Sequence, residues 1–272
     1  MPLVLTPRPI DRGPLSVDLS GIVPQITRSL DRESIARLPI RADEREARLG
    51  DLFTVAGDAS DEAIECRGDF ARVHGVGAGM TAGRIDVLGH VGRHAGEGMS
   101  GGVLSVAGSA GDWLAAEMAG GEVIVRGSVG DNAAAALPGS TSGMRGGLVV
   151  VMGDAGALAG ARMRRGMLAI GGDCGEAAGF EMRAGTVVVG GRIGRHAGMG
   201  MRRGSVIALT DRPIVPPTFR RGATWQPAFI PILLRRLERA GFTPARRISS
   251  GPWQHWHGDT LAGGRGELLF PG

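Results

Sequence analysis

The sequence predicts an all-β protein whose central part is a right-handed parallel β-helix, a solenoid with 19-residue coils. The main observation is a methionine followed three residues later by a glycine, seven times along the chain. These methionines are Met80, Met99, Met118, Met144, Met163, Met182 and Met201. Successive members are 19 residues apart, except for one step of 26 residues. Such a period indicates stacked repeats, each of which buries its apolar face against its neighbours.

A second observation is the alternating segment that begins each repeat. In one copy Ile85 and Val87 alternate with Arg84 and Asp86, and Gly89 follows. A two-residue period rich in β-branched side chains is typical of a short half-buried strand. Glycine tolerates a positive φ, so we expect the chain to turn sharply after each strand.

The rest of each repeat carries apolar residues at four-residue steps, such as Val91, Ala95 and Met99. We interpret these as inward positions, with one methionine per coil packed in the core. Helical repeats are disfavoured because the chain has 48 glycines, each of which costs a helix about 1 kcal/mol relative to alanine. The steps also differ from the six-residue period of left-handed coils, and parallel crossovers prefer the right hand.

We predict three regions: a cap over residues 1–63 that leads into the coils, the β-helix over 64–211, and a C-terminal extension over 212–272. Prolines after position 211 end the coils, and Phe229–Arg239 has the pattern of an amphipathic helix before a Trp/His-rich tail.

Within the cap, Leu3–Leu5 has the pattern of a strand and Pro24 that of a turn. Residues 29–33 resemble a helix start. We expect the segment 49–55 to enter the first coil.

The C-terminal end is strongly basic. Between Arg192 and Arg247 there are twelve arginines against only Asp211 and Glu238. We interpret this charge as a surface that docks acidic neighbours. Nucleic acid is not expected as a partner, because no aromatic stacking platform accompanies the charge.

Composition suggests the compartment and class. All 31 basic residues are arginine, and nowhere do 18 consecutive apolar residues occur. We therefore expect a soluble cytoplasmic protein with no membrane association. Cys66 and Cys174 occupy positions where other repeats carry Val, Ile or Ala, and we interpret them as small buried hydrophobes.

Two pairs of aspartates are candidates for chemistry. Asp154 and Asp173 occupy one place in consecutive repeats, and Asp112 and Asp131 another. Stacked carboxylates about 4.8 Å apart can bind Ca²⁺ or act as acid and base on a polysaccharide. Aspartate after glycine also satisfies backbone N–H groups in turns, which is the interpretation we favour.

Histidines form two further candidates. Arg-His-Ala-Gly occurs at 93–96 and again at 195–198, five coils apart, so the copies cannot form one site and we interpret them as exposed corner residues. His255 and His257 flank Trp256 and supply only two possible metal ligands. We predict no catalytic, cofactor-binding or metal-ligating residues in this chain.

The repeats resemble a known glycine-repeat β-helix. The block from Ile64 to Thr210 is similar to the one shared by the C-terminal domain of glutamate synthase large subunits and by the C subunit of formylmethanofuran dehydrogenase. Residues 49–53, Gly258-Asp259 and 264–267 resemble the latter. That C subunit has a version in the tungsten or molybdenum dehydrogenase of methanogenic archaea and one in the formyltransferase/hydrolase complex of methylotrophic bacteria. The lysine-free composition favours the second.

The resemblance implies a non-catalytic scaffold subunit in one-carbon metabolism. In the bacterial complex, a formyl group passes from a tetrahydromethanopterin carrier to a methanofuran-like carrier, methylofuran, and is then hydrolysed to formate. The implied partners are an amidohydrolase-like subunit, a formyltransferase subunit and a further subunit. No cofactor is implied for this chain.

Three alternatives stay open from the sequence. The first alternative is the C subunit of an archaeal-type tungsten or molybdenum formylmethanofuran dehydrogenase. The second is a detached glutamate-synthase-type domain. A stand-alone β-helix enzyme that acts on an anionic polysaccharide would use the stacked aspartates.

Overall fold

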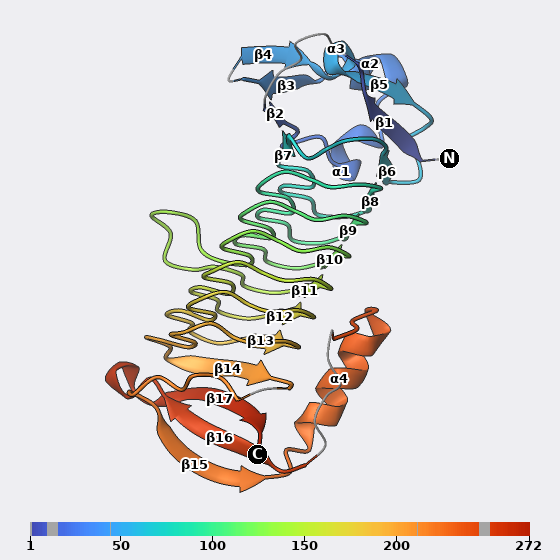
Figure 1. The fold of residues 1–272 in the computed structure, drawn as a ribbon. Coiled ribbons are helices and arrows are strands. Elements are labelled where there is room, and N and C mark those ends of the chain that lie inside the picture. The colour runs from blue at the N-terminus through green and yellow to red at the C-terminus, as the bar shows by residue number, and fades with distance from the viewer. Residues whose placement is uncertain (1, 10–15, 44, 211, 245–250) are drawn as a thin grey trace.

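The computed structural model describes residues 2–9, 16–43, 45–210, 212–244 and 251–272, and in this part of the chain the protein is mostly β with few helices (Figure 1). One large sheet contains the strands β1 (Leu3–Pro7), β5 (Phe53–Ala56), β6 (Ala63–Cys66), β8 (Arg84–Val87), β9 (Val103–Val106), β10 (Glu122–Val125), β11 (Leu148–Val151), β12 (Met167–Ile170), β13 (Thr186–Val189), β14 (Arg203–Ala208), β15 (Arg220–Trp225), β16 (Trp253–Gly258) and β17 (Arg265–Pro271). A smaller sheet contains β2 (Val17–Asp18), β3 (Pro39–Ala42), β4 (Arg45–Arg48) and β7 (Val73–His74).

In the large sheet, residues that lie opposite each other on adjacent strands of the repeats are separated along the chain by one repeat. Strands β6 and β8 to β14 pair in parallel, each with the next. Ile85 lies opposite Leu104, and Val149 lies opposite Leu168, which is the 19-residue offset predicted from the methionines. The single longer step separates Val123 from Val149, and the extra residues form a loop that projects from the stack (Figure 1).

The repeats touch at two more places besides these strands. Isolated parallel bridges join equivalent residues of successive repeats. They run through Phe70, Val91, Ala110, Val129, Ala155, Cys174 and Ile193. Farther along each repeat, the carbonyl of one methionine accepts the N–H one residue after the next methionine, as from Arg164 to Met144 at 2.8 Å. Each repeat is therefore fixed to its neighbour on three sides.

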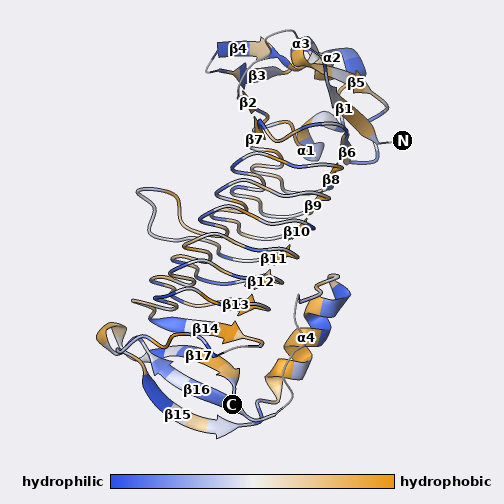
Figure 2. Ribbon diagram, in the orientation of Figure 1, coloured by the Kyte–Doolittle hydropathy of each residue, from blue (hydrophilic) through white to orange (hydrophobic). Residues whose placement is uncertain are grey.

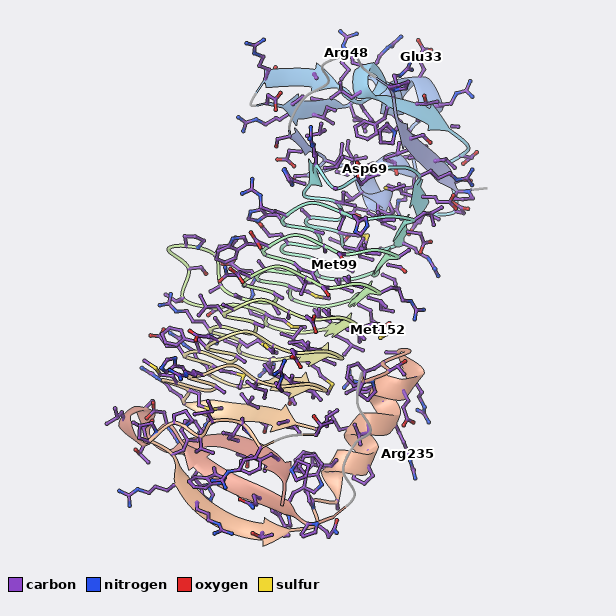
Figure 3. The ribbon with its side chains drawn as sticks, in the orientation of Figure 1. Glu33, Arg48, Asp69, Met99, Met152 and Arg235 are labelled. Carbon is purple, nitrogen blue, oxygen red and sulfur yellow. The ribbon has the colours of Figure 1, made fainter. Side chains whose placement is uncertain are left out.

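The methionines line the core, as the sequence predicts. All seven are fully buried, and Val91 and Ala95 are buried beside them. Figure 3 shows Met99 within the stack. A flexible thioether fills the space between stacked repeats without branching at Cβ.

The N-terminal end differs from the prediction in two places. Strand β1 pairs in parallel with β6, whereas β5 pairs with β1 in antiparallel fashion. The segment 49–55 therefore closes the edge of the sheet with helix α3 (Leu49–Leu52) and β5, and does not enter a coil. Pro24 begins helix α1 (Pro24–Thr27), where the missing N–H of proline costs nothing. The predicted helix start leads into α2 (Arg32–Ala36), capped by the Asp31 carboxylate.

The C-terminal tail returns to the stack. Strand β17 pairs in parallel with β14, and β16 and β15 follow in antiparallel order after it. The tail is thus part of the large sheet, which the sequence analysis did not predict. The 3₁₀ helix η1 (Thr260–Ala262) joins β16 to β17. Asp211, where we predict the repeats to end, lies outside the described residues.

Helix α4 (Phe229–Arg239) has the predicted bounds and lies beside the strands from β11 to β14 (Figure 1). Its Ile230 and Leu237 are buried in a cluster with Val150, Ala169 and Val188, which point outward from the sheet. Figure 2 shows hydrophobic and hydrophilic residues along α4, and Figure 3 shows Arg235 extending away from the strands. The apolar face of the helix therefore covers the chain's own sheet. None of the helices that the structure describes has the length and apolar composition needed to span a bilayer.

Candidate interaction surface

The stacked aspartates hold neighbouring repeats together. Oδ1 of Asp154 accepts the N–H of Asp173 at 2.7 Å, and Oδ1 of Asp112 accepts the N–H of Asp131 at 2.9 Å. The sequence analysis favoured bonds to backbone N–H groups, and the structure adds that the donors belong to the next repeat. Each carboxylate therefore has a structural role in the stack.

Other side chains in the column of Asp154 and Asp173 serve the same purpose. Nδ1 of His90 accepts the N–H of Ser109, Oγ of Ser109 accepts the N–H of Ser128, and Oγ of Ser128 accepts the N–H of Asp154. Since histidine and serine replace aspartate here, the column requires an acceptor and not a negative charge. In the described part of the chain, no group of three His, Cys, Asp or Glu side chains is placed to hold a metal ion.

The two Arg-His-Ala-Gly copies occupy the same place in their repeats, far apart along the stack. His94 stacks on Trp113 with ring centroids 6.2 Å apart, and its Nδ1 is paired with Glu97. Arg195 and His196 of the second copy are exposed. As predicted from the sequence, the structure keeps the two copies apart.

His255 and His257 face each other on β16, with ring centroids 4.0 Å apart. Nε2 of His255 lies 3.6 Å from Oε1 of Glu267, whose Oε2 accepts the hydroxyl of Ser205. Burial lowers the pKa of His255, the charge on His257 lowers it further, and Glu267 opposes this shift. His255, His257 and Glu267 therefore pack against one another on β16 and β17 of the C-terminal tail.

Both thiols are buried, and burial raises the pKa of Cys66 and of Cys174 to about 12. In Cys66 the charges of Asp86 and Glu65 add to the shift. Neither thiol ionises near neutral pH, so neither is a nucleophile.

The most distinctive surface feature is a column of arginines in the last four repeats. Arg145, Arg164, Arg183 and Arg202 each follow a buried core methionine directly, and we call them the arginine ladder. The earlier repeats carry Thr81, Ser100 and Ala119 at this place. The ladder is therefore confined to the C-terminal half of the stack.

The backbone holds the ladder in place. The N–H groups of Arg164, Arg183 and Arg202 donate to the methionine carbonyl of the preceding repeat at 2.8, 2.8 and 2.7 Å. Because neighbouring repeats lie about 4.8 Å apart, like charges stand one above another along one corner. No ion-pair partner for the ladder is found among the residues that the structure describes.

Two hollows adjoin the ladder. One of about 530 Å³ is lined by Arg145, Arg164, Arg165, Arg183, Ala184 and Arg203. The small side chain of Ala184 leaves space between Arg165 and Arg203, which occupy the same place in the repeats on either side. The other hollow, of about 450 Å³, is lined by Glu181, Arg183, Gly200, Arg202, Leu261, Ala262 and Arg265. Such a surface attracts anions or acidic groups.

The sequence analysis counted arginines from Arg192 onward and missed the part of the ladder that begins at Arg145. The available signal is the Met-Arg pair that recurs in four repeats. Arg246 and Arg247 of the predicted basic segment lie outside the described residues.

A stacked β chain held together by its side-chain acceptors, with a charged corner, has the features of a subunit that packs against others. Comparisons with known proteins agree with this class. No protein-family model matches the sequence. The chain is 38% identical over 80 residues to the C subunit of the formyltransferase/hydrolase complex Fhc of Methylorubrum extorquens. It is 35% identical over 97 residues to the C subunit of the molybdenum-containing formylmethanofuran dehydrogenase 1 of Methanothermobacter marburgensis.

These sequence alignments cover 29% and 35% of this chain, and 30% and 24% of the two relatives. The structural similarity is far more extensive. A chain in the crystal structure of the formyltransferase/hydrolase complex (FhcABCD) from Methylorubrum extorquens in complex with methylofuran matches with a TM-score of 0.86 and 34% identity, over 99% of both chains. The protein belongs to the family of formylmethanofuran dehydrogenase C subunits, which confirms the resemblance noted from the sequence.

Proposed function

We propose that this chain is a structural subunit of a formyltransferase/hydrolase complex and carries no catalytic group of its own. In this proposal the complex transfers a formyl group from a tetrahydromethanopterin carrier to a methanofuran-like carrier and hydrolyses it to formate. The match to a chain of the FhcABCD complex over 99% of both chains carries the proposal. Its partners are an amidohydrolase-like subunit, a formyltransferase subunit and a further subunit.

The proposed architecture is a right-handed parallel β-helix over residues 64–211. It is supported by the parallel pairing at 19-residue offsets, by the bridges on a second side of each repeat and by the prevalence of right-handed crossovers. Residues 1–63 and 212–272 then form the two ends. Pairing of β1 with β6 and of β17 with β14 supports a capping role for both. We also assign the chain to the cytoplasm, because its two cysteines are unpaired.

The test is a purification from the native host through a tag on this chain. The expected result is co-elution with an amidohydrolase-like and a formyltransferase-like protein, and formyl transfer by the assembly but not by the isolated chain. Elution with a glutaminase and flavin-containing partner would favour the glutamate-synthase alternative. A glycoside hydrolase or lyase activity of the chain alone would also refute the proposal.

A tungsten- or molybdenum-containing dehydrogenase is the second candidate, because three relatives belong to such enzymes. The extended structural match favours the formyltransferase/hydrolase assembly. Elemental analysis of the purified assembly separates the two, since tungsten or molybdenum bound in a fixed ratio to the complex is expected only for the dehydrogenase.

A further inference from the structure

The arginine ladder fits one kind of partner. We propose that it docks a helix of a partner subunit that carries Asp or Glu at every third or fourth position along one face. This inference rests on the assembly role proposed above, and it adds the surface and the chemistry of the contact.

The spacing of the ladder matches such a helix. Arginines in successive repeats rise by about 4.8 Å along the stack. Carboxylates three and four residues apart on a helix rise by about 4.5 and 6.0 Å. A guanidinium presents two parallel N–H donors to a carboxylate, so each repeat can hold one acidic side chain. A helix laid along the corner therefore meets Arg145, Arg164, Arg183 and Arg202 in turn.

The ladder is already in position before a partner arrives. The backbone N–H groups of its members are bonded to carbonyls of methionines that are fully buried. The contact therefore requires ordering of side chains only, which lowers the entropic cost of binding.

The chain's own carboxylates do not neutralise the ladder. Glu181 lines one of the hollows, but it is bonded to Arg162 at 2.8 Å. Asp173 is bonded to Arg192 at 2.8 Å in a different column. Among the described residues no carboxylate forms an ion pair with a ladder arginine. An acidic partner therefore reduces the repulsion between the four arginines.

Other features of the corner favour a protein helix over a nucleic acid. The residues that line the two hollows include no aromatic side chain on which a base could stack. The phosphates of a strand repeat about every 3.4 Å along the duplex axis, which does not match the repeats. Leu261 lies at the end of the ladder with 85% of its surface exposed, and it offers an apolar contact to an amphipathic helix.

An earlier repeat of the chain shows which residue can replace arginine in a test of the ladder. Ser100 occupies the ladder position in an earlier repeat, so serine is compatible with the fold there. The ladder variant is Arg164→Ser/Arg183→Ser/Arg202→Ser. The matched control is Arg41→Ser/Arg45→Ser/Arg48→Ser, which removes three exposed arginines from β3 and β4.

The first experiment co-expresses the complete complex with a tag on this chain at about 0.15 M salt. The ladder variant is expected to retain about tenfold less of one partner subunit than the unaltered chain does. The melting temperature of the tagged chain is expected to be unchanged, and the control variant is expected to retain the partner in full. Full retention by the ladder variant would overturn the inference and leave the proposed function intact. If the unaltered chain retrieves neither proposed partner, the proposed function fails instead.

The second experiment measures binding to the chain of a helical peptide of about 20 residues with glutamates at every third or fourth position. An isomer with the same residues spread around the helix is the comparison, and a single-stranded DNA oligonucleotide is the third probe. The striped peptide is expected to bind about tenfold more tightly than either, and the ladder variant is expected to lose this preference. Equal binding of the isomer, or tighter binding of the DNA, would contradict a helical partner.

Discussion

The methyl group of Met118 lies 2.8 Å from the place that a Cβ atom on Gly147 would take. Gly147 has a φ of +90° and belongs to the next repeat. The same relation links Met144 to Gly166 and Met163 to Gly185, at 2.8 and 2.9 Å. The Met-x-x-Gly pattern thus reflects a contact between repeats, because the methyl group of each of these methionines packs against the glycine of the next repeat.

Gly166→Ala is therefore expected to destabilise the protein by about 2–4 kcal/mol. The new methyl group would meet the Met144 methyl group at 2.8 Å and the backbone of Gly147 and Gly146 at 3.0 and 3.1 Å, and alanine is strained at positive φ. Gly98 has a φ of +61° and open space around it, so Gly98→Ala isolates the backbone strain and is expected to cost about 1–2 kcal/mol. Chemical denaturation measures both. Equal losses for the two variants would contradict the packing relation.

Met163→Ala is expected to lower the free energy of unfolding by about 2–5 kcal/mol, because it leaves a cavity in a core that neighbours cannot fill. Met163→Lys is expected to abolish folded protein, since the charge would be buried without a partner. Met199, two residues before a core methionine, is 44% exposed. The control Met199→Lys is expected to fold, as followed by circular dichroism, and a folded Met163→Lys protein would refute the inward assignment.

The aspartate column gives a test of structure against catalysis. Asp154→Ser is expected to keep most of the stability, because Ser128 accepts the same kind of N–H in the preceding repeat. Asp154→Ala is expected to cost about 1–3 kcal/mol by leaving the Asp173 N–H without its acceptor. Formyl transfer by the complete assembly should be unchanged in both variants. A large loss of activity in the stable Asp154→Ser variant would indicate a chemical role for the carboxylate.

Stability is expected to fall in mild acid. Nδ1 of His74 accepts the N–H of Arg93 at 3.0 Å, which requires the unprotonated nitrogen. Burial lowers the pKa of His74, and the charges of Arg93 and His94 lower it further, while Asp18 opposes the shift. An unfolded histidine titrates near pH ~6.5, so the stabilisation is complete above that value and is lost as the pH falls toward the lower pKa of the folded protein. The lowered pKa of His255 acts in the same direction.

The measurement is thermal unfolding between about pH 7.5 and pH 5. His74→Asn keeps an acceptor oxygen without a titrating group, and Asp112 accepts an N–H at the equivalent place. This variant is expected to lose less stability than the unaltered protein over that range. An equally steep loss would contradict the role of His74.

The register of the repeats could be predicted because the same residue types recur at a fixed distance. The return of β17 could not, because it pairs with β14 across a long non-repeating segment that no period connects. The inner face of β17 is apolar at Leu268 and Phe270, and its outer face carries Leu269. These residues resemble those of any short strand, so the sequence does not specify where they pair.

The sequence contains a signal for the packing of α4 against the sheet, which the sequence analysis did not use. Outward positions in the early repeats hold polar residues such as Asp86 and Ser105, whereas Val150 and Ala169 hold the equivalent places later. This change from polar to apolar side chains indicates a covered sheet face. The helix pattern alone could not reveal that its partner lies in the same chain.

Deletion of residues 219–272 is a test of this packing. From the sequence alone, this deletion would release the subunit from its assembly and leave the coils folded. The structure predicts a different result, because loss of α4 and β17 uncovers Val150, Ala169 and Ile207 and the open edge of β14. The truncated chain is therefore expected to aggregate, as measured by size-exclusion chromatography. A monomeric truncated chain with an unchanged melting temperature would contradict the capping role.

The most direct test of the structural role is formyl transfer by an assembly reconstituted with and without this chain, together with the activity of the chain alone. We expect the complete assembly to be active, the chain alone to be inactive, and the other subunits to dissociate when the chain is left out. Full activity and intact association of the remaining subunits without it would contradict the proposed role.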